Sequence, residues 1–268
     1  MRQTLKNTPT AKLIELFSAI QGEGLNVGTR QIFIRFAICD LRCNFCDSAH
    51  TWQPTDRCKI EQTPGKRDFV TYANPITLPQ LLEWVEQQNQ PGLHDSISVT
   101  GGEPLLHAPF LQEFLPLVKK QTGLPIYLET GGHRPQQLKM ILANLDSVGM
   151  DLKLPSVSGE NCWLAHEEFL QTCRHGGVEV FVKMIISAQT DPEELRQAAQ
   201  LVAAHSPTIP VFLQPVTPLK GLETLGGKHG IHLQPPTPEQ VLEWQGLMKR
   251  ELKHVRVVAQ THKMMGQL

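Results

Sequence analysis

The sequence lacks the features that would link it to a charged polymer or a membrane. Its 25 Lys and Arg nearly balance its 26 Asp and Glu, and the formal net charge of −1 indicates no nucleic-acid partner. No stretch approaches the roughly 20 apolar residues of a membrane span, and residues 1–12 are polar, without the apolar segment of a signal peptide. These absences predict a cytoplasmic protein that acts on a small molecule and has no membrane partner.

Repeats and low-complexity tracts are also absent, and apolar strand-like runs alternate with helical patterns through most of the chain. Strands are expected at 31–37, 96–100, 124–129, 147–152, 178–186, 209–213 and 254–259. Helices are expected near 78–89, 106–121, 135–144, 163–174, 191–204 and 237–252. Strands joined by helix-length crossovers predict a parallel sheet. We expect it to form a single domain over 1–268, with loop insertions near 53–76 and 215–236.

Three of the six cysteines lie close together in the sequence. Cys39, Cys43 and Cys46 follow the strand expected at 31–37 and lie in a segment rich in turn-forming residues. An iron–sulfur cube normally takes four thiolates, so a cube held by three would leave one iron open, which is typical of a catalytic metal site. Two alternatives stay open: the same thiolates could form a closed Cys3His zinc site with His50, or they could be core thiols.

Polar and glycine-rich residues follow several of the expected strands. Ligands gather at the carboxyl ends of strands in barrels and open parallel sheets, so we expect these residues to share one rim. The segments concerned are 100–104 (TGGEP), 129–132 (ETGG), 151–153 (DLK), 214–215 (QP) and 260–263 (QTHK). In the first of them, the glycines permit close approach of the backbone to a ligand, and Glu103 can accept from a ligand ammonium.

The spacing C-x3-C-x2-C, with an aromatic residue before the last cysteine, resembles the signature of the radical S-adenosylmethionine superfamily, and TGGEP resembles its GGEP motif. The resemblance implies an α/β fold, a partial or modified (β/α) barrel. It implies a [4Fe–4S] cluster on the three cysteines, whose free iron binds S-adenosylmethionine, and an electron donor such as flavodoxin or ferredoxin. The implied cofactor contacts are Phe45, Asp47, Gly101, Gly102, Glu103, Glu129, Asp151, Leu152, Lys153 and Gln214.

Three further motifs narrow the resemblance. QGEG at 21–24, CDSAHTW at 46–52 and QTHK at 260–263 resemble the 7-carboxy-7-deazaguanine synthases, lyases of queuosine and deazapurine biosynthesis. That family forms homodimers and, with Mg²⁺, converts 6-carboxy-5,6,7,8-tetrahydropterin to 7-carboxy-7-deazaguanine with loss of ammonia. Ser48 matches its magnesium position. The implied substrate contacts are Ile20, Gln21, Gly22, Glu23, Arg35, Thr100, His262 and Leu268.

One segment departs from the pattern of this family. Where the synthases commonly have Ser-Pro-Lys, this chain has Asp151, Leu152 and Lys153. The triplet is reminiscent of the activating enzymes that install glycyl radicals on partner proteins. An activity of that kind is therefore the alternative reading, and the contacts to the nucleoside are the part that the departure puts in question.

Overall fold

The computed structural model describes residues 9–217 and 233–266. Its strands are β1 Thr10–Ala11, β2 Leu13–Ile20, β3 Arg30–Phe36, β4 Arg57–Glu61, β5 Phe69–Ala73, β6 Ile76–Thr77, β7 Ser96–Gly101, β8 Ile126–Thr130, β9 Ser147–Asp151, β10 Glu179–Ile186, β11 Val211–Pro215 and β12 Val255–Val257. Its α-helices are α1 Leu78–Gln88, α2 Ala108–Thr122, α3 Pro135–Ile141, α4 Pro155–Ser158, α5 Trp163–Gly176, α6 Pro192–His205, α7 Pro238–Met248 and α8 Thr261–Met264. Short 3-10 turns lie at Gly24–Asn26, Ala49–Thr51, Pro104–His107 and Leu142–Asn144.

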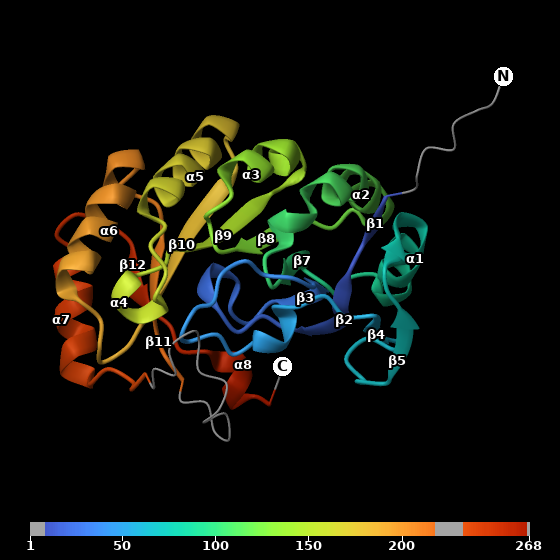
Figure 1. Cartoon of the computed structure of the whole chain (residues 1–268), viewed down its shortest axis with the longest axis horizontal. Helices are drawn as coiled ribbons and strands as arrows, with labels where there is room; N and C mark the ends of the chain where they lie inside the picture. The colour runs from blue at the N-terminus through green and yellow to red at the C-terminus, as the bar shows by residue number, and fades with distance from the viewer. Residues whose placement is uncertain (1–8, 218–232, 267–268) are drawn as a thin grey trace.

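One ten-stranded sheet organises the molecule, in the order β12-β11-β10-β9-β8-β7-β3-β2-β4-β5. Strands β3 and β7 to β12 all run parallel, and they are the strands that the sequence predicts. The predicted helices are confirmed as α1, α2, α3, α5, α6 and α7, which form an outer row along the sheet (Figure 1). The sheet edges β12 and β5 do not pair with each other within the described residues, so the barrel is partial.

The N-terminal side of the sheet differs from expectation. The segment 53–76 is not a loop insertion, because it contains β4 and β5, an antiparallel pair that extends the sheet beyond β2. Cys58 and Ile60 alternate with exposed residues along β4 and are buried, which explains why this polar segment forms a strand. Most of the second expected insertion, 215–236, lies outside the described residues.

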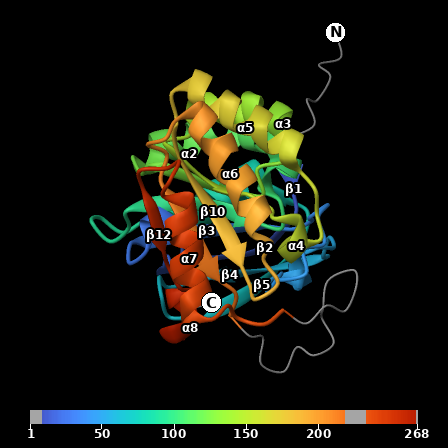
Figure 2. The ribbon, with the colours of Figure 1, turned by 90° about the vertical axis from the view of Figure 1, so that its left-hand side faces the viewer.

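Local sequence signals set several helix starts. Helices α1 and α7 each begin with a capping box, in which Thr77 pairs with Gln80 and Thr237 with Gln240. Asp191 accepts from the N–H of Glu193 at the start of α6. Figure 2 shows α6 and α7 from the side, at the β12 end of the sheet. No helix in 9–217 or 233–266 is both long and apolar enough to cross a membrane.

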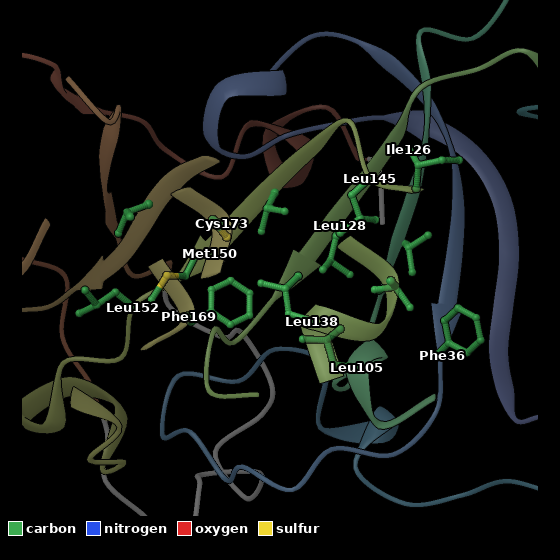
Figure 3. Packing of buried hydrophobic residues seen from close by; sticks show 14 of the residues in the cluster. Phe36, Leu105, Ile126, Leu128, Leu138, Leu145, Met150, Leu152, Phe169 and Cys173 are labelled. Atoms are coloured by element: carbon green, nitrogen blue, oxygen red, sulfur yellow. The ribbon is translucent and has the colours of Figure 1, made fainter. Parts of the chain in front are cut away.

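The main hydrophobic core lies between the outer face of the sheet and the helices. Leu128 of β8 and Met150 of β9 point into it and meet Leu138, Phe169 and Cys173 of the helices (Figure 3). All five side chains are fully buried. Because side chains alternate along a strand, the residues that follow Leu128 and Met150 on each strand, both acidic, face the opposite, inner side.

The lower part of this inner side is closed by aromatic residues. Tyr127, Phe181 and Phe212 form a separate buried cluster, with ring centroids 5.9 and 5.4 Å apart. Leu25, which follows the QGEG segment, and Val258, which follows β12, pack against it. We call Tyr127, Phe181 and Phe212 the aromatic layer. It forms a floor above which the inner side of the sheet holds polar groups.

Candidate functional site

A cavity of about 430 Å³ lies on the inner side of the sheet. Of the predicted site residues, Leu268 lies outside the described residues. Leu152 does not line the cavity, and its side chain packs in the hydrophobic core (Figure 3). Strand alternation turns the Leu152 side chain away from the cavity, and its contact with the cofactor stays a prediction. All other predicted site residues line it, namely Ile20, Gln21, Gly22, Glu23, Arg35, Cys39, Cys43, Phe45, Cys46, Asp47, Ser48, Thr100, Gly101, Gly102, Glu103, Glu129, Asp151, Lys153, Gln214 and His262.

Six adjacent parallel strands each contribute at least one polar side chain to this cavity. We call this set the inner polar layer: Arg35 of β3, Thr100 of β7, Glu129 of β8, Asp151 of β9, Lys183 of β10 and Gln214 of β11. Thr100 donates to Glu129 at 3.2 Å, which links two neighbouring strands. Parallel strands thus bring together residues that are up to 179 positions apart in the sequence.

Lys183 is the member of this layer that sequence reasoning missed. It lies in the middle of the apolar run 178–186, whereas the other members of the layer, apart from Arg35, were sought where the expected strands end. Its Nζ lies 3.2 Å from Glu129 Oε1 and 3.8 Å from Asp151 Oδ2, and it also contacts Glu23 of the QGEG segment. Burial opposes its charge, but the three carboxylates raise the pKa of Lys183 well above its usual value. The sequence signal that could have identified Lys183 is a single lysine within an otherwise apolar strand.

The departure at 151–153 has a local explanation. Lys153 Nζ lies 2.9 Å from Asp151 Oδ2 and 5.0 Å from the ring centre of Phe45, and the Asp151 carboxylate raises the pKa of Lys153 against the effect of burial. The backbone N–H of Lys153 donates to Nε2 of buried His166, whose Nδ1–H donates to the Gly132 carbonyl. Two lysines thus balance the additional carboxylate, and a histidine fixes the two strand ends.

The three cysteine thiols line the same cavity directly after β3. Burial raises the pKa of Cys39 to about 11 and that of Cys43 to about 12. Within the described ranges, no three His, Cys, Asp or Glu side chains converge as ligands of one ion. A cluster spreads its irons over several positions, one for each thiolate, so these three donors fit it.

The TGGEP segment lies directly against the cysteine segment. A Cβ at Gly101 would lie 2.2 Å from the Phe36 carbonyl oxygen, and one at Gly102 would lie 2.3 Å from that of Ile38. The N–H of Gly102 donates to Phe36 and that of Glu103 donates to Ile38. Only glycine permits this approach, which sets the two predicted cofactor segments side by side.

Several buried polar atoms of the cavity have no partner among the described residues. They include Nε2 and Oε1 of Gln214 and Oδ1 of Asp151. Buried polar groups are nearly always hydrogen-bonded in folded proteins. These atoms can therefore bond to a ligand that carries both donors and acceptors, as the nucleoside and amino-acid parts of S-adenosylmethionine do. By contrast, Glu103 already accepts from Thr130 and from the N–H groups of Leu105 and Gly131.

The QGEG segment and the C-terminal segment meet across the cavity. Gln21 Oε1 accepts from the N–H groups of Gly22 and Glu23, so this predicted substrate contact also shapes its own loop. The N–H of Thr261 donates to the Gly22 carbonyl at 3.1 Å. A Cβ at position 22 would lie 2.3 Å from Nδ1 of His262. Glycine is therefore needed where the two segments touch.

Arg35 has a partner that the sequence reasoning did not identify. Glu15 lies opposite it on β2, and Glu15 Oε1 accepts from Arg35 Nε at 2.7 Å. Each side chain is only 14% exposed, and both line the cavity. Among the described residues, no other hydrogen bond uses the guanidinium, so its terminal nitrogens can clamp a carboxylate.

Oxygen donors adjoin the cysteine segment. Ser48 Oγ donates to Asp47 Oδ1 at 3.1 Å, and Lys263 Nζ lies 2.7 Å from Asp47 Oδ2. Burial opposes ionisation of Asp47, but Lys263 lowers its pKa to about 2. Gln260 donates to both Asp47 and Glu23. Hydroxyl and carboxylate oxygens are ligands that Mg²⁺ accepts, so the donor chemistry suits this ion.

The chain matches one family model and is similar to known sequences. A model described as the Radical SAM superfamily matches residues 33–202. The chain is 42% identical over 263 residues, 97% of its length and 99% of the relative's, to a 7-carboxy-7-deazaguanine synthase of Geobacter sulfurreducens. It is 30% identical over 264 residues, 96% of its length and 94% of the relative's, to a 7-carboxy-7-deazaguanine synthase of Methanopyrus kandleri.

Two solved structures share the fold. QueE from Escherichia coli superposes with a TM-score of 0.57 at 19% identity, covering 93% of each chain. Streptococcus suis SuiB bound to S-adenosylmethionine superposes with a TM-score of 0.56 at 13% identity, covering 85% of this chain and 51% of that one. These similarities confirm the predicted partial (β/α) barrel.

Proposed function

Because the chain belongs to the 7-carboxy-7-deazaguanine synthase family of the radical S-adenosylmethionine superfamily, we propose that it converts 6-carboxy-5,6,7,8-tetrahydropterin to 7-carboxy-7-deazaguanine with loss of ammonia. The structural observation that carries this proposal is that the three cysteine thiols and the inner polar layer line one cavity. Such a cavity can hold a radical source beside a small polar substrate and exclude water from both.

We propose that Cys39, Cys43 and Cys46 hold a [4Fe–4S] cluster. With one electron from the reductant, a cluster held there would, together with S-adenosylmethionine, supply the radical chemistry that removes a hydrogen from C6 of the pterin. The TGGEP backbone and the unpartnered atoms of Gln214 and Asp151 would orient S-adenosylmethionine. Two observations support this assignment: the TGGEP segment lies against the cysteine segment, and buried polar atoms such as those of Gln214 and Asp151 need hydrogen-bond partners.

We propose that the pterin lies between Arg35 and the QGEG segment. The free guanidinium nitrogens of Arg35 would clamp the substrate carboxylate, and Glu15 would hold the guanidinium in place. The carboxylate of Glu23 would accept from the pterin edge, because Lys183 and Gln260 keep it ionised and fixed. His262 and Thr100 would complete the pocket.

Ser48, with Asp47 beside it, is the proposed magnesium site, where the ion would orient the substrate carboxylate during rearrangement and ammonia loss. Since Mg²⁺ usually keeps several waters and uses few protein ligands, we expect its binding to depend on bound substrate. From the family we also propose a cytoplasmic homodimer that receives electrons from a flavodoxin or ferredoxin.

Turnover by the anaerobically reconstituted protein tests the function. With S-adenosylmethionine, reductant, Mg²⁺ and the carboxytetrahydropterin, we expect 5′-deoxyadenosine and 7-carboxy-7-deazaguanine by mass spectrometry. Deoxyadenosine without deazaguanine would keep the superfamily chemistry and reject the substrate. Cys43→Ser should lose iron and both products, whereas Cys162→Ser, a matched change outside the triplet, should keep them.

A further inference from the structure

Lys183 contacts carboxylates from three separate segments. Its Nζ meets Glu23 after β2, Glu129 in β8 and Asp151 at the end of β9. The ammonium donates hydrogen bonds to Glu23 and Glu129, and Asp151 Oδ2 lies within ion-pair distance at 3.8 Å. The Lys183 side chain is 9% exposed, so these contacts form away from bulk water.

These partners belong to different halves of the cavity. Glu23 lies in the segment assigned to the pterin, while Glu129 and Asp151 lie in the half assigned to S-adenosylmethionine. Glu23 is further held by Gln260 at 2.8 Å. Among the described residues, Lys183 is the one cation that contacts both Glu23 and the carboxylates of the cofactor half.

The lysine is not needed to fill the sheet. A buried charge is costly unless it is paired, and an apolar residue of similar size often stabilises a protein as well or better. The outward neighbours of Lys183 on β10, Val182 and Met184, are apolar and fully buried. A lysine at this position therefore points to a task that an apolar side chain could not perform.

We propose that Lys183 is a positioning residue that couples the two halves of the site, holding Glu23 in register with Glu129 and Asp151. The inference rests on the proposed function and adds to it. Without this ammonium, three carboxylates would repel one another and Glu23 would leave the pterin edge. Substrate would then be held poorly relative to the radical source, and radical formation would proceed without productive transfer.

The test combines Lys183→Met, Lys183→Arg and Glu23→Gln in the reconstituted protein. Lys183→Met should raise KM for the pterin about 10- to 100-fold. It should also raise the yield of 5′-deoxyadenosine per deazaguanine several-fold over wild type, while iron content stays unchanged. Lys183→Arg should bring both the KM and the yield of 5′-deoxyadenosine per deazaguanine part of the way back to the wild-type values. Lys119→Met, at an exposed lysine paired with Asp146, is the matched control and should change neither.

A double-mutant cycle separates positioning from other roles. If Lys183 acts through Glu23, Lys183→Met should add little to the effect of Glu23→Gln. The inference would be overturned if the fold-changes of the two single variants multiply in the double variant. It would also be overturned if Lys183→Met has a normal KM and a normal yield of 5′-deoxyadenosine per deazaguanine. If Lys183→Met does not fold, the same cycle with Lys183→Arg decides. Wild-type protein that makes no deazaguanine would reject the proposed function itself, which is a separate result.

Discussion

The inner side of the sheet carries two layers of opposite chemistry on the same strands. Strands β8, β10 and β11 each present an aromatic residue and, two positions further along, a polar one. The pairs are Tyr127 with Glu129, Phe181 with Lys183, and Phe212 with Gln214. The first of each pair closes the floor, and the second faces the cavity. Position along a strand therefore decides the role of a residue here, more than the strand to which it belongs.

The two layers depend on each other through the QGEG segment. Glu23 contacts Lys183 in the polar layer, while a Cβ at the next residue, Gly24, would lie 2.4 Å from the Phe181 ring. The aromatic floor removes water beneath the charges, and charges in a low-dielectric setting interact strongly. If this division holds, changes in the floor should cost stability, and changes in the polar layer should cost function.

The largest effect is expected for Phe181→Ala. Truncating a buried phenylalanine typically lowers the free energy of unfolding by about 3–5 kcal/mol, because contacts are lost and a cavity remains. Phe181→Leu should cost less. Denaturant unfolding measures both. A Phe181→Ala protein of normal stability that has lost turnover would break the proposed division of the two layers.

Two histidines that are buried in the neutral form should make the free energy of unfolding depend on pH. Burial lowers the pKa of His94 and of His166 to about 4, from a usual value of 6.5. The unfolded chain therefore takes up protons at a higher pH than the folded protein does. The free energy of unfolding should fall as pH drops from 6.5 to 4, by up to about 1.4 kcal/mol per pH unit for each histidine.

Two observations check this assignment. Asp47, with a pKa of about 2, contributes stability that is complete above pH 3.8 and is lost only between 3.8 and 2, so it does not act in the same window. His166→Gln should lower stability at pH 7 but make the slope between pH 6.5 and 4 shallower by about one proton. An unchanged slope would mean that His166 does not titrate there.

The parallel strands and much of the site are readable from sequence for physical reasons. Strands buried on both faces appear as largely apolar runs, which is why β3 and β7 to β11 were predictable. Polar residues at strand ends share a rim, so that rule located Thr100, Glu129 and Asp151, while their predicted roles came from the family resemblance. The hairpin of β4 and β5 was missed because it is polar, contains Pro64 and Gly65 between its strands, and shows only weak alternation.

Two side chains of the candidate site, Lys183 and Glu15, were not predicted from the sequence. Lys183 lies within a strand rather than at its end, and the parallel register of β10 with β9 places it directly beside Asp151. Glu15 needs β2 to be recognised as a strand before its position opposite Arg35 can be known. Both are contacts between strands, and only the register of the sheet determines them.

Substitutions of Arg35 and of its partner Glu15 should differ in their effect on KM for the pterin. Arg35→Ala should raise KM for the pterin about 10- to 100-fold, since a charged hydrogen bond to the substrate carboxylate is lost. Glu15→Gln keeps one acceptor for Nε and should raise KM by only a few-fold. Steady-state kinetics with iron assays measure both. Loss of iron in Arg35→Ala would place Arg35 with the cluster instead of the substrate.

The smallest effect is expected at the amino-terminal ends of the strands, opposite the ends that carry the cavity. Lys119 Nζ lies 2.7 Å from Asp146 Oδ1 just before β9, and both side chains are 39% exposed. Exposed pairs are worth about 0.2–1 kcal/mol, because water screens the charges. Asp146 also accepts from the N–H of Ile126, so it keeps a partner when Lys119 is removed. Lys119→Met should therefore change the free energy of unfolding by less than about 1 kcal/mol and leave turnover unchanged. A large loss of activity there would show that buried charge at the cavity is not what distinguishes Lys183.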